Sequence, residues 1–379
     1  MKNQASFVFA MVAAAILAGP SASRAGVGEA SALFPVTIPA KNNGVAGVKF
    51  VGIPVARPSI YEGLVTTTVP ANSNSSTVFS DSGFDAIVKA ALGNPEASTA
   101  RVTDNNFATG DNQYVLEITS GANIGLTKII SSFSIGGVTV VGGFALPVER
   151  GTKYVIRKDW TLGTLFGNTA AAIAASGLSG GLASSAENIG LVRSGVLELY
   201  YWTGSAWKPT RNVVTGIDYS HVRVPLSGGI YVKVNKTTDA TLYMTGIYRP
   251  TRLQALLEGA DNAVFAVSTP NFKETTLAET GLHRYVKTST LISACDEVRV
   301  LTSAGTVQSY VNSASPSANG YTGGFWDGSS TNPPSWKSTR SGGVAGSANN
   351  LVIPAGSAVL IKKEGAGARQ LGIDPTYTQ

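Results

Sequence analysis

Short apolar stretches separated by Gly, Asn, Asp and Pro recur along the chain, and this pattern is typical of a protein built from β-strands. Residues 196–202 divide into two faces, so Leu197, Leu199 and Tyr201 should lie on the same side of a strand. Residues 264–267 are apolar throughout, as in a strand covered on both faces. The predicted strands are 48–55, 114–119, 137–141, 153–157, 196–202, 230–234, 241–245, 263–268, 297–302 and 358–362.

Helices should be few and short. Residues 84–92 carry an apolar stripe at i, i+3 and i+4 that stops at a Gly-Asn-Pro sequence. Residues 251–258 lie between a proline and a glycine, which are suitable boundaries for a second helix. Residues 160–166 and 275–280 are each long enough for one or two helical turns.

One aromatic pattern occurs twice. Residues 201–208 carry two tryptophans around a Thr-Gly-Ser turn, and this pattern returns at 325–329 and, after an insertion, at 335–337. Because 124 residues separate Trp202 from Trp326, the repeat is too long for a solenoid and suits whole domains or half-sandwiches. Each copy is followed by a Pro-Gly segment that runs into an apolar strand, at 224–233 and 353–362. A weaker third copy of the Pro-Gly strand alone lies upstream at 146–157.

A low-complexity stretch suggests a boundary. Residues 168–185 are mostly Ala, Gly and Ser, a composition that favours a flexible loop or interdomain connection over a membrane helix. We therefore expect an all-β protein of two or more β-sandwich or barrel-like units, internally repeated, with a few short helices. The expected division is 1–25 signal peptide, 26–165 N-terminal β domain, 166–194 Gly/Ala/Ser-rich connection, and 195–379 C-terminal β region with both aromatic copies.

The first 25 residues have the features of an export signal. Lys2 gives a positive start, residues 7–18 are apolar, and Ala25 closes a small-residue cleavage site. The apolar run is too short to span a bilayer, which takes ~20 residues. The sequence therefore predicts an exported protein of the periplasm, the outer surface or the extracellular space, with no transmembrane anchor after cleavage.

Charge and cysteine content narrow the function classes. The net charge is +6, and it falls to +4 when residues 1–25 leave with Lys2 and Arg24. The basic residues are scattered rather than clustered, so nucleic acid is not an expected partner. Cys295 is the single cysteine and allows no intrachain disulfide. Its apolar surroundings indicate a small buried side chain rather than a catalytic thiol.

Motifs that carry chemistry match poorly. Residues 177–181 fit G-x-S-x-G, but no apolar strand precedes Ser179, and Asp218 and His221 lie only three residues apart. Residues 104–111 resemble a calcium loop without its required glycine. The chain has two histidines, so a His-based zinc site is not expected. We predict no catalytic residue, metal or cofactor, although paired carboxylates of a hydrolase would leave no mark in the sequence.

Four of the five tryptophans lie in the two aromatic hairpins. Exposed rings there could stack on sugar faces, whereas buried rings would pack the sheet. An alternating strand turns only some of its side chains inward, so both roles stay open. The candidate ligand-binding residues are Tyr201, Trp202, Trp207, Phe325, Trp326 and Trp336, with a polysaccharide or other envelope proteins as the partner.

Several short segments of the sequence carry a family resemblance. They are Phe-Val-Gly-Ile-Pro at 50–54 with Arg57 and Pro58, and the segments 114–122, 156–167 and 277–282. Through most of the mature chain, the sequence resembles an uncharacterised family of exported β-rich proteins from verrucomicrobial-type environmental bacteria. The resemblance implies export and β architecture, and it assigns no site residue.

The sequence favours a non-catalytic exported protein of the cell envelope or matrix that uses its repeated β units for structure or adhesion. One alternative is a carbohydrate-binding protein that uses the tryptophan hairpins. A second is a secreted hydrolase, which would need a cleft that gathers two carboxylates, or Ser179 with His221. An outer-membrane barrel would need evenly spaced strands of about ten residues, and the spacing here is uneven.

Overall fold

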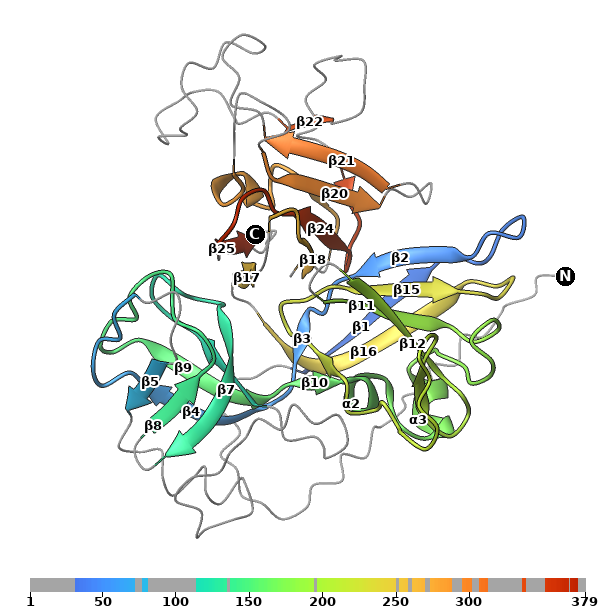
Figure 1. The fold of residues 1–379 in the computed structure, drawn as a ribbon, viewed down its shortest axis with the longest axis horizontal. Helices are drawn as coiled ribbons and strands as arrows, with labels where there is room; N and C mark the ends of the chain where they lie inside the picture. The colour runs from blue at the N-terminus through green and yellow to red at the C-terminus, as the bar shows by residue number, and fades with distance from the viewer. Residues whose placement is uncertain are drawn as a thin grey trace, which may run out of the picture.

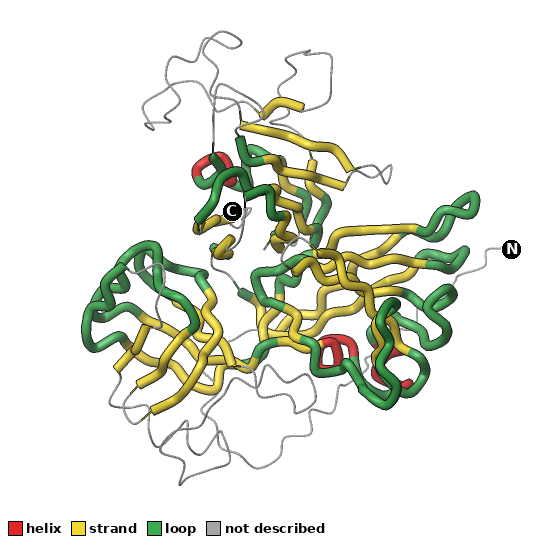
Figure 2. Tube along the Cα trace, viewed as in Figure 1, coloured by secondary structure: helices red, strands yellow, loops and turns green. Residues whose placement is uncertain are grey.

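The computed structural model describes residues 31–71, 77–80, 114–134, 137–193, 196–249, 252–257, 261–269, 273–287, 295–301, 307–312, 336–338, 352–367 and 369–373. Antiparallel β-sheets account for nearly all the regular structure of these residues, which also contain two short α-helices and one 3₁₀-helix (Figure 2). The predicted all-β class is therefore confirmed. No helix within the described ranges is long and apolar enough to cross a membrane.

Three separate hydrophobic cores divide the described chain into three units (Figure 1). We call residues 31–56 with 160–249 unit 1, residues 59–158 unit 2, and residues 252–373 unit 3. Unit 2 is inserted into unit 1, because the chain leaves the first core after residue 56 and returns to it at residue 160. The cores thus group the chain differently from the expected division at residues 165 and 194.

Unit 1 packs a five-stranded sheet against a three-stranded sheet. Its strands are β1 (Ser31–Ile38), β2 (Gly47–Val51), β3 (Val55–Ala56), β10 (Trp160–Thr161), β11 (Asn188–Arg193), β12 (Val196–Trp202), β13 (Trp207–Pro209), β14 (Arg223–Val224), β15 (Ile230–Val234) and β16 (Ala240–Tyr248). The larger sheet has the order β13-β12-β11-β15-β2, and the smaller has the order β1-β16-β3. A short ladder pairs β10 with β14.

The low-complexity stretch belongs to unit 1 and is not a loose connection. It follows α2 (Leu162–Phe166) directly and contains the whole of α3 (Ala170–Ala175). Thr161 caps α2 in a capping box, and Ile173 and Leu178 are buried in the first core. Its small residues permit this packing, because a Cβ on Gly177 would overlap the carbonyl oxygen of Thr241.

Unit 3 repeats the topology of unit 1. Its elements are β17 (Leu253–Leu257), β18 (Val264–Ser268), β19 (Thr275–Thr276), η1 (Leu282–Arg284), β20 (Glu297–Leu301), β21 (Val307–Asn312), β22 (Trp336–Ser338), β23 (Val352–Ile353), β24 (Ala358–Lys362) and β25 (Arg369–Ile373). The sheet order β18-β24-β20-β21-β22 matches β2-β15-β11-β12-β13. The ladder β19-β23 matches β10-β14, and the pair β17-β25 matches β1-β16. The predicted internal repetition of β units is therefore confirmed, whereas the second aromatic copy at 325–329 lies outside the described residues.

The helix predicted at 251–258 is wrong, because residues 253–257 form β17. This strand pairs with β25 from Leu253 opposite Ile373 to Leu257 opposite Arg369. Its partner lies at the far end of unit 3, so pairing with a distant strand overrides the local helix signals. The helical turn predicted within 160–166 is α2, residues 275–276 form a short strand, and the helix predicted at 84–92 lies outside the described residues.

Unit 2 follows the same strand order with one strand added. Its strands are β4 (Ser59–Leu64), β5 (Thr77–Ser80), β6 (Tyr114–Ile118), β7 (Thr127–Ser134), β8 (Gly137–Val140) and β9 (Lys153–Lys158). The sheet order is β4-β9-β6-β7-β8-β5, in which the first five strands match the five-stranded sheets of units 1 and 3. A single bridge between Val69 and Val148 takes the place of the short ladder.

All three units have a similar turn before the strand that comes last along the chain among the five equivalent strands, namely β15, β24 or β9. The closing hydrogen bonds are donated by Gly228 N–H to Pro225 O (2.9 Å), by Ser357 N–H to Pro354 O (3.1 Å) and by Thr152 N–H to Glu149 O (3.1 Å). We call these the closing turns. In unit 2 the turn thus begins at Glu149, two residues after the proline that marks the third copy in the sequence.

Units 1 and 3 join through their closing turns in a reciprocal way. The Ser268 N–H of unit 3 donates to Ser227 O of unit 1 at 3.1 Å, and the Gly52 N–H of unit 1 donates to Gly356 O of unit 3 at 2.7 Å. The two donors lie at equivalent ends of β18 and β2, and the two acceptors lie at equivalent places in the closing turns. The contact therefore has pseudo-two-fold symmetry, like the interface of a symmetric dimer.

Unit 2 contacts unit 3 through the turn between β6 and β7. Leu126 forms a bridge with Gln254, whose N–H donates to Gly125 O at 3.1 Å. A Cβ on Gly125 would overlap the carbonyl oxygen of Arg252, so glycine is needed for the close approach. Backbone contacts thus link unit 3 to both other units.

Candidate functional site

The first aromatic hairpin lies in the core of unit 1. Trp202 and Trp207 face each other across β12 and β13, are 2% and 0% exposed, and have ring centroids 6.0 Å apart. The Nε1–H of Trp207 donates to Gly167 O at 2.9 Å. These two rings cannot stack on a ligand, because they face the inner side of the sheet. Tyr201 lies on the opposite side and is half-buried.

The second aromatic hairpin is described only at its end. Trp336 begins β22, which pairs with β21 with Asn312 opposite Trp336, and nothing is stated of its side chain. Phe325 and Trp326 lie outside the described residues. A ligand role for these three aromatic residues stays a prediction.

The serine of the G-x-S-x-G match has a structural partner. The Ser179 Oγ–H donates to Glu187 Oε2 at 2.7 Å, and the Ser179 N–H donates to the same oxygen at 2.8 Å. Lys236 forms an ion pair with the other oxygen of Glu187 at 2.8 Å. The carboxylate that accepts from this hydroxyl also accepts from the Ser179 N–H and is paired with Lys236, so the contact anchors the loop.

Asp218, the acid that follows the serine in the sequence, also has a structural role as an acceptor of backbone hydrogen bonds. Its Oδ1 accepts hydrogen bonds from the Trp207 N–H at 2.9 Å and the Ser220 N–H at 3.1 Å. It therefore fixes the backbone on either side of the loop after β13. Cys295 is buried, consistent with a small core side chain.

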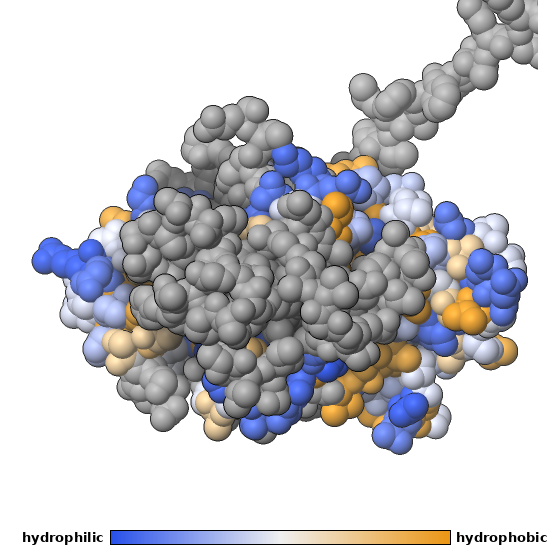
Figure 3. All heavy atoms as spheres, turned by 90° about the horizontal axis from the view of Figure 1, so that it is seen from above, coloured by the Kyte–Doolittle hydropathy of each residue, from blue (hydrophilic) through white to orange (hydrophobic). Residues whose placement is uncertain are grey.

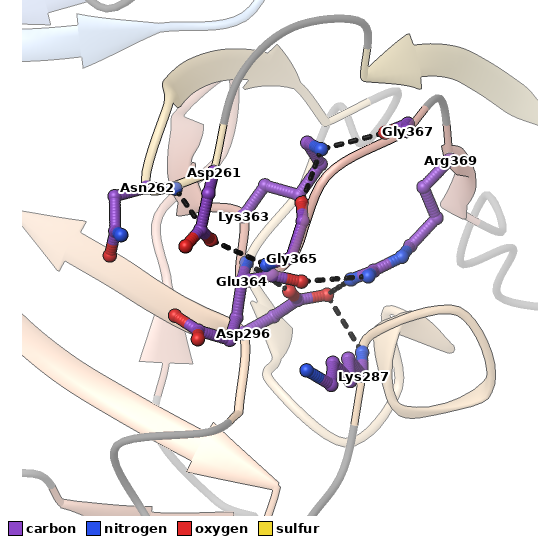
Figure 4. Close-up of polar contacts among 9 residues, drawn as sticks. All are labelled: Asp261, Asn262, Lys287, Asp296, Lys363, Glu364, Gly365, Gly367 and Arg369. Atoms are coloured by element: carbon purple, nitrogen blue, oxygen red, sulfur yellow. Dashed lines mark hydrogen bonds and ion pairs between the residues drawn. The ribbon is translucent and has the colours of Figure 1, made fainter.

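The densest polar contacts of unit 3 surround Asp296, which precedes β20 and is fully buried (Figure 4). Asp296 Oδ2 accepts from the Lys287 N–H at 2.7 Å, and Oδ1 accepts from the Glu364 N–H at 2.7 Å. Arg369 forms an ion pair with the same carboxylate, and its Nη2 donates to Glu364 O at 3.0 Å. The carboxylate thus joins residues 287–296 to residues 364–369, two regions that are far apart in the sequence.

Lys363 lies beside this cluster with no exposed surface. Its Nζ donates to the carbonyl oxygens of Gly365 and Gly367, both at 2.7 Å (Figure 4). Asp261 accepts from the Asn262 and Gly365 N–H groups on the other side of the same loop. A buried ammonium needs such partners, because an uncompensated charge is costly away from water. The loop 363–367 is therefore folded around its own cation.

Unit 1 has a counterpart of this arrangement. Glu187 is buried immediately before β11, as Asp296 is before β20. Its partner Lys236 follows β15, as Glu364 follows β24. In units 1 and 3 a buried carboxylate ties the start of the central strand of the five-stranded sheet (β11 or β20) to the segment that follows the neighbouring strand (β15 or β24). Equivalent positions with different partners indicate a role in the scaffold rather than in binding one ligand.

A third buried carboxylate joins unit 2 to unit 1. Glu117 lies in β6, all of whose residues are buried, and its oxygens contact Arg157 of β9 at 3.0 Å and Arg249, just after β16, at 2.6 Å. Burial alone would raise the pKa of Glu117, but the two guanidinium groups outweigh it and hold the pKa below its ordinary value. The carboxylate is therefore ionised and fixed between two units.

The same junction contains a second ion pair. Asp159 is buried between units 2 and 1, forms an ion pair with Arg223 of β14, and accepts from the Trp160 N–H. The Trp160 Nε1–H donates to Val55 O at 2.9 Å, and the Arg57 guanidinium lies 5.8 Å from the Trp160 ring. The two chain crossings between units 1 and 2 are thus held together by charge and by an aromatic ring.

Among the described residues, no group of three or more His, Cys, Asp or Glu side chains could hold a metal ion. Comparison of the chain with family models, curated proteins and solved structures finds no match. The buried carboxylates Glu117, Asp159, Glu187 and Asp296 were not singled out by the sequence analysis. One signal was present, because Glu117 interrupts an apolar strand, and a buried acid requires a partner.

Proposed function

We propose that this chain is a non-catalytic exported protein of the cell envelope or matrix, in which three β units of common topology act as one structural body. The observation that carries the proposal is the reciprocal contact between units 1 and 3, made by backbone hydrogen bonds through equivalent turns. An enzyme needs polar groups aimed at a substrate. Here the buried carboxylates described above are aimed at the protein's own backbone and cations instead.

The proposal is tested in an organism that carries the gene. The protein should be found in the envelope or matrix, and intact mass should show a chain that begins at Gly26. Deletion of the gene should weaken the matrix or raise sensitivity to detergent. A copy with Ser179→Ala and His221→Ala should restore the wild-type phenotype, because a structural protein needs neither residue for chemistry.

Two outcomes would contradict this proposal. A cytoplasmic location would remove its basis in export. Failure of a folded Ser179→Ala or His221→Ala protein to restore the phenotype would favour the hydrolase alternative. Folding of each variant is checked by its melting temperature, because Ser179 also anchors the Glu187 loop.

The carbohydrate-binding alternative now concerns the second hairpin, since Trp202 and Trp207 are buried. Titration with a panel of polysaccharides, followed by tryptophan fluorescence, compares the wild-type chain with Trp326→Ala. A saturable change that Trp326→Ala abolishes would replace the structural proposal with a sugar-binding one. No response to any glycan leaves the structural proposal in place.

A further inference from the structure

The described surface is mixed, with small hydrophobic patches among hydrophilic residues on the face drawn in Figure 3. Five large apolar side chains that come from only two segments of unit 1 are between 36% and 60% exposed. One segment is the start of β12, and the other is the loop 211–217 that follows β13. We call the five residues the apolar tip, and they are Val196, Leu197, Val213, Val214 and Ile217.

Strand register brings the two segments together. Tyr200 lies opposite Pro209, and the Thr210 N–H donates to Leu199 O at 2.8 Å. The loop 211–217 therefore starts beside Leu199, two residues along β12 from Leu197. Val196 and Leu197 project to opposite sides of β12, so the loop residues Val213, Val214 and Ile217 are the main part of the tip.

The loop stands on a fixed base. The Trp207 N–H donates to Asp218 Oδ1 at 2.9 Å, the Tyr219 N–H donates to Trp207 O at 3.0 Å, and Lys208 Nζ donates to Ile217 O. Trp207 is itself fully buried. All seven residues of the loop are exposed, so a firmly anchored loop holds three aliphatic side chains in water.

The exposed charge on the loop of the tip is basic. Arg211 is exposed and Lys208 is half-buried. The neighbouring acids are engaged within the fold, because Glu198 accepts from the Tyr200 hydroxyl at 2.8 Å and Asp218 accepts from backbone N–H groups. Exposed apolar side chains on a loop that also carries an exposed arginine suit a membrane surface, where the arginine stays at the level of the headgroups.

A protein partner is a poorer match for this shape. A stable protein interface covers about 800 Å² on each side with close complementarity, whereas the tip is a seven-residue loop beside the start of one strand. A bilayer needs no complementary surface and accepts protruding aliphatic groups directly.

We propose that the apolar tip is a peripheral membrane-docking site that inserts Val213, Val214 and Ile217 into the surface of an anionic bilayer. The inference rests on the envelope location proposed above and names the partner as a lipid surface. Arg211 faces the lipid phosphates, while Lys208 holds the base of the loop through Ile217 O.

The test is cosedimentation of the purified chain, without residues 1–25, with vesicles of phosphatidylethanolamine and phosphatidylglycerol, and with vesicles of phosphatidylcholine alone. The wild-type chain should bind the anionic vesicles more strongly. The double variant Val213→Ser with Val214→Ser should bind at least about tenfold more weakly, because it loses two apolar side chains that leave water on docking. Arg211→Gln should reduce binding to the anionic vesicles alone.

The matched control is Leu33→Ser, which removes an apolar side chain that is 60% exposed on β1 of the same unit and should leave binding unchanged. Absence of wild-type binding, or equal binding by the double variant, would overturn the inference. So would self-association without lipid that the double variant abolishes, because the tip would then be an interface between copies. Vesicle binding does not depend on cellular location, so its failure is distinct from failure of the structural proposal.

Discussion

At the scale of single residues, the buried carboxylates form ion pairs and accept hydrogen bonds that join distant segments, which an apolar side chain could not do. Glu117 is the clearest example, because its two oxygens contact arginines from two different units. Removing one partner of a buried ion pair leaves the other charge uncompensated and costs far more than losing an exposed pair. The stability of the junction between units 1 and 2 should therefore depend on the ionisation of one side chain.

The first prediction concerns Glu117→Gln. At neutral pH this variant should lose about 3–5 kcal/mol of unfolding free energy, because two buried guanidinium groups lose their counter-charge. The lowered folded pKa means that the stabilisation by Glu117 is complete above its ordinary value of 4.5 and is lost as the pH falls through the folded pKa. The difference between wild type and variant in urea unfolding should therefore shrink as the pH falls below 4.5.

Glu279→Gln is the control for this measurement. The pKa of Glu279 is also lowered, chiefly by hydrogen bonds from Thr276, but the side chain is almost fully exposed. Its substitution should change stability little at any pH. If the two variants lose equal amounts of unfolding free energy, the Glu117 ion pairs do not stabilise the junction between units 1 and 2.

At the scale of elements, the aromatic hairpin shows how far a local pattern can be interpreted. The sequence predicts the β12–β13 hairpin and the two faces of β12, and the structure has the hairpin with Trp202 opposite Trp207. The sequence leaves open which face of β12 is covered, because that depends on α2 and the rest of the first core. The helix predicted at 251–258 is wrong for a related reason, since its partner strand is distant in the sequence.

The second prediction concerns Trp207. Trp207→Ala should cost about 3–5 kcal/mol, as expected for a large buried ring. Trp207→Phe should cost less but still about 1–3 kcal/mol, because Gly167 O loses its donor. Urea denaturation followed by circular dichroism measures both. Tyr201→Ala, on the opposite face of β12, is the comparison, and a loss as large as that of Trp207→Ala would contradict the assignment of faces.

At the scale of the whole molecule, three units of one topology are assembled in two different ways. Units 1 and 3 form the pseudo-symmetric contact, and Gly229 and Ala358 lie at equivalent places where a Cβ on Gly229 would overlap that of Ala358. The equivalent residue of unit 2 is the exposed Lys153. A lysine does not fit at this contact, so unit 2 is excluded from the pairing and joins the assembly through Glu117 and the β6–β7 turn instead.

The third prediction compares Gly356→Ala with Gly151→Ala. Both glycines occupy equivalent places in closing turns and both have positive φ angles, 64° and 85°, so both variants suffer the same backbone strain of about 1–2 kcal/mol. A Cβ on Gly356 would also overlap the ring of Phe34 in unit 1, whereas Gly151 has open space around it. Gly356→Ala should therefore lose about 1–3 kcal/mol more.

Differential scanning calorimetry measures this difference. The Gly356→Ala chain should show a separate, earlier transition for unit 3, whereas the Gly151→Ala chain should keep the profile of the wild type at a slightly lower temperature. Equal losses in the two variants would mean that the contact between units 1 and 3 contributes little to stability.

The sequence by itself determined the β class, the internal repeat and the positions of ten of the 25 strands in the described residues, because side-chain alternation and turn residues act over a few neighbouring positions. Only the tertiary structure decided that unit 2 is inserted into unit 1, that the low-complexity stretch is packed, and that the first pair of tryptophans is buried. It also decided which acids meet which bases, as between Glu117 and Arg249. These features depend on residues far apart along the chain, and no local pattern records which distant segment will cover a given face.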